Sequence, residues 1–265
     1  MAWFAGKQNA AGAAESATVA EQMRLAFEAS QEGNYEAALA IWGALAHQGV
    51  GRAQNNIGAC FAEGLGVDRD PALAIKWLTA AAASGDAAGQ RNLAAAYFKG
   101  EGVEESAERA AELYRSAAEQ GDAAAQDMLS WMLLEGEIIA PDFKDAKYWA
   151  EAAAAQGNAA SMTRLGLIYH NALGVERDAA QAVKWWDKAA ARGDADAQAM
   201  LGAAYHLGAG VPRDPVSALM WLLRGQYGGS QLATPFIDPV RASMNDYDKE
   251  RAKKLAEMPL PEPVS

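Results

Sequence analysis

Histidine and cysteine are the residue types best suited to metal binding and acid–base chemistry, and this chain has three histidines and one cysteine. Two of the histidines, His170 and His206, stand 36 residues apart, which is the period of an internal repeat described below. Equivalent positions of adjacent repeats lie about 10 Å apart in packed helices, too far for one zinc ion with bonds of about 2 Å. We therefore expect both to be polar surface residues, and we predict no metal and no cofactor.

Motifs that would support catalysis are missing from the sequence. It contains no HExxH, GxSxG or CxxC pattern and no Walker-type lysine. Cys60 cannot form an intrachain disulfide, and we expect a small buried helix residue there rather than a nucleophile. The glycine-rich turn at residues 64–66 lacks a phosphate-binding fingerprint and recurs along the chain, which favours a turn that ends a helix. The acidic pair Glu104 and Glu105 has no identifiable base partner. The sequence therefore predicts no catalytic residue and a protein that is not an enzyme.

Composition and charge exclude further classes. The 265 residues are 51% hydrophobic and carry a formal net charge of -11. Nucleic-acid binding relies on clustered Lys and Arg, so an acidic chain is not expected to bind nucleic acid. No run of 18 apolar residues occurs, so no membrane span is expected. Glu15 interrupts the alanine-rich stretch that follows Lys7, which argues against a signal peptide. The cytoplasm is the expected compartment, and the periplasm is the alternative.

Alanine-rich helices are arranged in an internal repeat. Glycines recur every 36 residues at Gly49, Gly85, Gly121, Gly157 and Gly193. Leucines, small residues and large apolar residues keep the same spacing, and the large column consists of Trp77, Leu113, Trp149, Trp185 and Trp221. Five repeats follow from this register: 51–86, 87–122, 123–158, 159–194 and 195–230.

Each repeat is predicted to be a pair of helices. Asp86 precedes the first helix of the second repeat and can accept a hydrogen bond from its first turn. Gly100 and Gly102 suit a left-handed exit at the end of that helix. An N-cap residue type precedes the second helix of every repeat, at Asp70, Ser106, Asp142, Asp178 and Asp214. One helix pair cannot bury its apolar face alone, so successive pairs are expected to stack.

The repeats resemble the Sel-one-like repeat, a relative of the tetratricopeptide repeat. The resemblance rests on a motif that recurs in this sequence, for example as Leu165-Gly166, Tyr169, Gly174-Val175, Asp178, Ala182, Trp185 and Gly193. It extends over residues 51–230. It implies an all-α fold, a right-handed superhelical solenoid of antiparallel helix pairs.

Residues outside the repeats are expected to protect the ends of the stack. Residues 16–49 resemble an N-terminal tetratricopeptide helix pair, and residues 231–258 are expected to form C-terminal capping helices. Residues 1–15 and the tail 259–265 are expected to be mobile.

The third repeat departs from the common pattern. Ser130 replaces a Gly or Ala, Leu133 replaces an aromatic residue, and Ile138 stands where the other repeats have a glycine. A β-branched residue adopts a left-handed turn only at a cost, so a distorted turn is expected. Residues 123–158 are therefore either a binding site or a degenerate repeat.

By the same resemblance, the first helix of each pair lines the concave side of the solenoid. The positions expected to face a partner there are Asn55, Arg91, Phe98, Asp127, Trp131, Thr163, His170 and His206. Aromatic residues also fill helix interfaces, so Phe98 and Trp131 are equally expected to pack between repeats. The sequence predicts a scaffold or adaptor that binds a protein or peptide in the assembly or regulation of a bacterial complex. The alternatives are a hydrolase of the same repeat family, or a periplasmic or secreted regulatory protein.

Overall fold

The computed structural model describes residues 18–136 and 139–260. The expectations for residues 1–15, for Ile138 and for the tail from residue 261 lie outside these ranges. Fourteen α-helices and one short 3-10 helix occur in the described ranges. Consecutive helices pack as antiparallel pairs, which confirms the predicted all-α fold.

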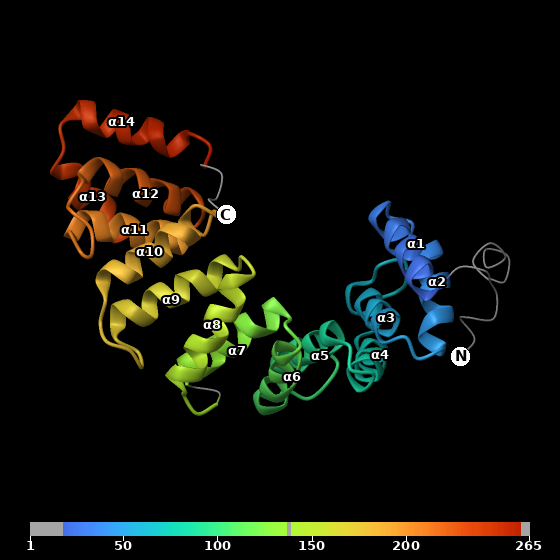
Figure 1. Ribbon diagram of the computed structural model, residues 1–265. Helices are drawn as coiled ribbons and strands as arrows, with labels where there is room; N and C mark the ends of the chain where they lie inside the picture. Colours follow the sequence, from blue (N-terminus) through green and yellow to red (C-terminus); the bar gives the residue numbers. More distant parts are fainter. Residues whose placement is uncertain (1–17, 137–138, 261–265) are drawn as a thin grey trace. The chain divides into compact units, whose positions relative to one another are not determined.

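The chain forms two compact units, Met1–Ala125 and Gln126–Ser265. In unit 1, three helix pairs follow one another and α7 begins at the end (Figure 1). Their bounds are α1 (Val19–Gln31), α2 (Tyr35–His47), α3 (Gly51–Glu63), α4 (Pro71–Ala83), α5 (Ala87–Lys99), α6 (Ala107–Glu119) and α7 (Ala123–Glu135). The apolar core around α1 to α4 includes Leu39, Trp42, Leu45 and Ile57.

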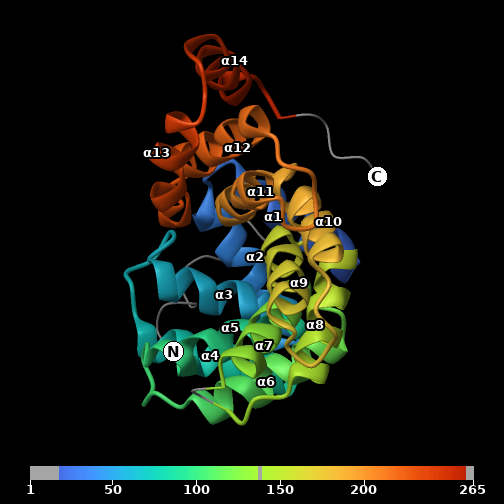
Figure 2. The ribbon, with the colours of Figure 1, turned by 90° about the vertical axis from the view of Figure 1, so that its left-hand side faces the viewer.

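In unit 2, α7 continues, and further helix pairs are followed by a terminal group in which α14 packs against α12 (Figure 2). Their bounds are α8 (Phe143–Ala155), α9 (Ala159–Asn171), α10 (Ala179–Ala190), α11 (Ala195–Leu207), α12 (Pro215–Tyr227), η3 (Gln231–Ala233), α13 (Thr234–Ala242) and α14 (Asp246–Glu257). Pro239 lies inside α13, which is only nine residues long.

The predicted helix starts are confirmed by N-cap hydrogen bonds. The Asp86 carboxylate accepts from the backbone N–H of Gly89 at 2.8 Å, which satisfies a donor that the helix itself leaves unpaired. The second helices begin in the same way, with caps at Asp70, Ser106, Asp142, Asp178 and Asp214.

Helix ends use left-handed residues, as the glycine pattern predicted. Four of the first helices have a left-handed C-cap, at Gly64, Gly100, Ala172 and Gly208. Gly102 shows why the next turn position also needs glycine, because its φ is +77° and an added Cβ would lie 2.6 Å from the Pro71 carbonyl oxygen. Ala172, with φ of +59°, is the one non-glycine residue with positive φ in the described ranges.

The two helices of a repeat pack through a column of residues that was not predicted from the sequence. Within the predicted large column, Trp149 is buried, whereas Trp77, Trp185 and Trp221 are half-buried. The adjacent column is buried in every repeat, at Leu78, Tyr114, Ala150, Trp186 and Leu222. These residues lie four after the buried alanine column, so they share its helix face, whereas the predicted column lies three after it at the edge of that face.

Small residues of the first helices lie against this buried column. An added Cβ on Gly58 would lie 2.8 Å from Leu78, and one on Gly166 would overlap the Trp186 indole. In the third repeat, Ser130 is accommodated opposite the smaller Ala150, and its hydroxyl donates to the Ala146 carbonyl at 2.8 Å. The substitution at Ser130 therefore has a packing reason.

Candidate partner-binding site

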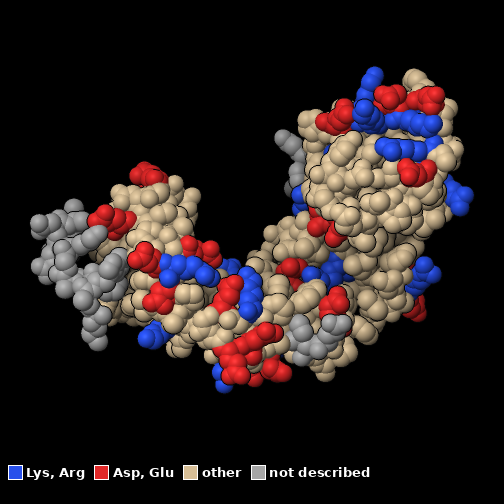
Figure 3. Space-filling view, turned by 180° about the vertical axis from the view of Figure 1, so that it is seen from behind, with Lys and Arg blue, Asp and Glu red and all other residues tan. Residues whose placement is uncertain are grey.

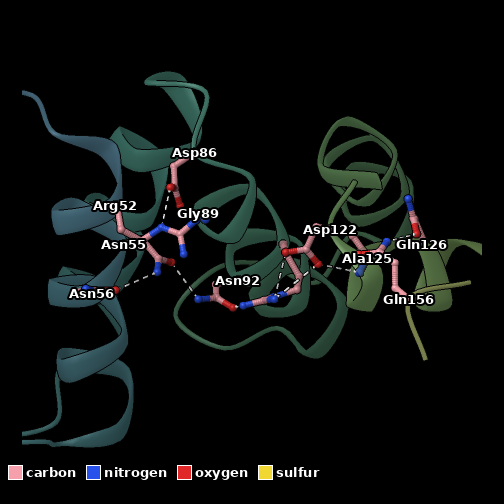
Figure 4. A network of polar contacts seen from close by, with 11 residues as sticks. Arg52, Asn55, Asn56, Asp86, Gly89, Asn92, Asp122, Ala125, Gln126 and Gln156 are labelled. Atoms are coloured by element: carbon pink, nitrogen blue, oxygen red, sulfur yellow. Dashed lines mark hydrogen bonds and ion pairs between the residues drawn. The ribbon is translucent and has the colours of Figure 1, made fainter. Parts of the chain in front are cut away.

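Two of the predicted site residues of unit 1, Asn55 and Arg91, belong to a polar network between α3 and α5, drawn in Figure 4. The Asn92 amide donates to Asn55 Oδ1 at 2.8 Å, and the Asn55 amide donates to Asn56 Oδ1 at 3.3 Å. Arg91 Nε donates to Asn92 Oδ1 at 3.3 Å, and Arg91 Nη1 pairs with Asp122 Oδ2 at 3.0 Å. The network thus connects α3 of the first repeat to α5 and Asp122 of the second repeat.

This network places Asn55 and Arg91 in contacts within the chain. Asn55 is buried, and the Arg91 side chain is 33% exposed while it pairs with Asp122. Substitution of either residue would change contacts within the chain as well as any contact with a partner. Partner binding by these two residues remains a prediction.

In unit 2, Asp127 and Thr163 are held by different partners. Asp127 accepts hydrogen bonds from Ser161 Oγ and Arg164 Nη1, both at 2.5 Å. The Thr163 hydroxyl is bonded to Asp194 Oδ1 at 2.9 Å. The Asp127 contact connects the third repeat to the fourth, whereas the Thr163 contact connects α9 to Asp194 at the end of the same repeat.

Asn92 and Arg164 take part in these contacts, although neither was among the site residues predicted from the sequence. Both stand directly before a leucine of the repeat register, in the column Asn56, Asn92, Met128, Arg164 and Met200. The occurrence of both Met and polar residues in this one column was the sequence signal that could have identified Asn92 and Arg164. A polar side chain at a position that also accepts Met is typical of a half-buried interface between repeats.

The aromatic and histidine candidates are half-buried. Phe98 and Trp131 each interact with other groups of the chain. The His170 ring lies 5.4 Å from the Trp186 ring, and the His206 ring lies 6.3 Å from Phe236. The histidines are therefore packed against aromatic rings rather than free at the surface, where they were expected.

Chemically reactive arrangements are not found in residues 18–136 and 139–260. No group of three potential ligands there could hold a metal ion. Cys60 is buried, as predicted, and burial raises the pKa of its thiol to about 11. At neutral pH its thiol therefore stays protonated and weakly nucleophilic. No helix in the described part of the chain has the length and apolar character needed to cross a membrane.

A cavity of about 250 Å³ lies in unit 1 beside the polar network. Ala59 and Ala62 of α3, Ile75 and Leu78 of α4, and Ala95 of α5 contribute apolar lining. Asn92 also lines it and connects the cavity to the network. Acidic side chains gather at the loop between α5 and α6 and at the start of α6, whereas both signs of charge lie over α14 (Figure 3). The arrangement can hold an apolar group next to a fixed amide.

Two solved structures resemble the chain over most of its length. A Sel1 repeat protein from Oxalobacter formigenes is 29% identical with a TM-score of 0.78, and the match covers 89% of this chain and 98% of that one. A protective antigen of uropathogenic Escherichia coli strains, which displays an SLR fold, is 31% identical with a TM-score of 0.83. That match covers 92% of this chain and 53% of the antigen chain. No curated protein matches the sequence.

The repeats themselves match a known protein family. The family described as Sel1 repeat matches residues 51–86, 87–122, 123–158, 159–194 and 195–225. These matches cover more than half of the chain and agree with the similarity to the two solved structures. The chain belongs to the Sel1 repeat family.

Proposed function

We propose that this chain is a non-enzymatic scaffold or adaptor that binds a partner protein or peptide on the face formed by the first helices of its repeats. Its place would be in the assembly or regulation of a bacterial complex. Membership of a repeat family whose scaffolds typically mediate protein interactions supports this role. The cytoplasm remains the compartment predicted from the sequence, with the periplasm as the alternative.

The observation that carries the proposal is the open cavity between α3, α4 and α5, with the Asn92 amide at its side. Interaction surfaces commonly combine a small apolar hollow with a few fixed polar groups. A second supporting feature is that one half-buried column of the first helices changes in chemistry from repeat to repeat, whereas the buried packing column differs mainly in side-chain size. The half-buried column reads Ala62, Phe98, Leu134, His170 and His206. A scaffold that recognises a particular partner needs residues of differing chemistry at its binding positions.

The alternative function, a hydrolase, leads to a different expected result. It requires purified protein to turn over a substrate and to lose that activity when His170 or His206 is changed. Both rings pack against aromatic residues, so their substitution is expected to affect packing rather than chemistry.

A matched pair of charge reversals tests the scaffold proposal. Lys99 lines the cavity at the end of α5, and Lys76 is exposed on α4 outside it. Partners captured by the immobilised full chain from a native lysate and identified by mass spectrometry are expected to be lost from Lys99→Glu and kept by Lys76→Glu. Equal capture by both variants would place binding elsewhere, and absence of any reproducible partner would count against the scaffold role.

A further inference from the structure

The cavity has a specific origin in the sequence. Its apolar wall includes Ala59, Ala62 and Ala95, and we call it the alanine cavity after these three residues. The residue equivalent to Ala62 in the second repeat is Phe98, and the residue equivalent to Ala95 in the third repeat is Trp131. The same scaffold therefore stacks with large side chains at these positions. In the first two repeats the alanines leave that volume open.

The polar side of the alanine cavity is held in a fixed orientation. Asn92 donates one amide N–H to Asn55 Oδ1 at 2.8 Å, and its carbonyl oxygen accepts from Arg91 Nε at 3.3 Å. Arg91 is itself held by Asp122. The second N–H of the Asn92 amide has no partner within residues 18–136 and 139–260. An amide N–H next to an apolar hollow suits a backbone carbonyl oxygen of a bound peptide.

The charges at the rim restrict the chemistry of the occupant. Glu63 and Glu101 oppose Arg69 and Lys99, so the four rim charges sum to zero. Arg69 is fixed there because its Nε donates to the Ala62 carbonyl at 2.8 Å. Because the rim charges balance, the part of a bound partner that lies at the rim is expected to be uncharged. Further out, the acidic side chains at the loop between α5 and α6 favour basic over acidic residues in the partner (Figure 3).

We propose that the alanine cavity receives one large aliphatic or aromatic side chain from an extended segment of the partner protein, while Asn92 donates to that segment's backbone. Residues next to this anchor are uncharged, and Lys or Arg is preferred over Asp or Glu further along. This inference rests on the proposed scaffold function. It adds the place of the anchor and the type of sequence that carries it.

Cavity-filling variants copied from the chain's own repeats test the assignment. Ala62→Phe reproduces Phe98, Ala95→Trp reproduces Trp131, and Ala59→Leu reproduces Leu167 in case a larger residue impairs folding. The probe is a library of random 12-residue peptides displayed on phage and selected on the full chain. Selected peptides are then synthesised and titrated against each variant. Far-UV circular dichroism and thermal melting confirm that a variant is folded.

Selection is expected to enrich peptides with a single Leu, Ile, Met, Phe or Trp anchor and no Asp or Glu beside it. Filling the cavity is expected to weaken their binding at least about 30-fold, as blocking a central anchor does. A second readout uses alanine-methyl NMR, in which the peptides are expected to shift the signals of Ala59, Ala62 and Ala95. The matched control is Lys76→Glu, which lies outside the cavity and should bind as the native chain does.

The outcomes separate the two proposals. If peptides or the captured partner bind the native chain and all folded cavity-filling variants equally, the scaffold function stands and the alanine-cavity assignment is wrong. An enriched motif with a charged anchor would overturn the assignment in the same way. If neither peptides nor a lysate partner bind the native chain, both proposals fail.

Discussion

Arg91 of α5 pairs with Asp122, the last residue of the same repeat, at 3.0 Å between Nη1 and Oδ2, while Asp122 also caps α7 of the next repeat. The Asp122 carboxylate accepts from the Ala125 backbone N–H at 2.9 Å. One carboxylate thus starts a helix and joins two repeats. Asp86 has the same double role, because it accepts from Gly89 N–H at 2.8 Å and from Arg52 Nε at 2.9 Å.

The double role of Asp122 predicts an unequal cost for the two halves of the pair. Asp122→Ala removes both the cap and the ion pair, and we expect it to lower the free energy of unfolding by about 1–2 kcal/mol. Arg91→Ala removes a partly exposed ion pair and the 3.3 Å hydrogen bond from Nε to Asn92, but no helix cap, and is expected to cost about 0–1 kcal/mol. Urea unfolding followed by circular dichroism measures both. A larger loss for Arg91→Ala than for Asp122→Ala would contradict the double role.

Ala172 predicts a stabilising substitution. It occupies the left-handed C-cap position of α9 with φ of +59°, where the equivalent residue of α11 is Gly208 with φ of +72°. A side chain in this conformation costs roughly 1–2 kcal/mol, offset in part by the greater freedom of glycine in the unfolded chain. Ala172→Gly is therefore expected to raise the free energy of unfolding by about 1 kcal/mol. The mirror substitution Gly208→Ala should lower it by a similar amount, and equal signs for the two changes would refute the argument.

Cys60 provides a pH-dependent test of burial. Its pKa is raised by burial from 9.0 to about 11. The folded state therefore keeps the thiol proton more tightly than the unfolded state, so this contribution to stability is complete below pH 9 and is lost as the pH rises towards 11. A thiol reagent at pH 8 should leave the native chain unmodified and react once the chain is unfolded in urea. Rapid native reaction would show that the thiol is accessible. Cys60→Ala should reduce the loss of stability between pH 9 and 11.

Local signals in the sequence account for what could be predicted. Helix caps and left-handed turns depend on residues within one or two helical turns, so the residue types alone predict them. Examples are the caps at Asp70 and Asp86 and the turns at Gly100 and Gly102. The 36-residue period then gives the order of the helix pairs.

Contacts between side chains far apart in the sequence could not be predicted in this way. Asn55 bonds to Asn92, 37 residues away, and Arg91 pairs with Asp122, 31 residues away. No local sequence pattern predicts which of these side chains come into contact. The alanine cavity depends on several such positions being small together. Its lining residues were visible in the sequence, but the space that they leave was not.

The match between Gly166 and Trp186 predicts a compensating pair of substitutions. An added side chain at position 166 would overlap the Trp186 indole, whereas the third repeat combines Ser130 with the small Ala150 at the equivalent positions. Gly166→Ser is expected to cost about 1–3 kcal/mol by overpacking, and Trp186→Ala about 3–5 kcal/mol by opening a cavity. The double variant reproduces the third-repeat pair, so its cost should be smaller than the sum of the two by about 1 kcal/mol or more. A double-mutant cycle on unfolding free energies measures this coupling. Simple additivity would mean that the two positions do not share one space, and the complementary sizes along this interface would then lose their explanation.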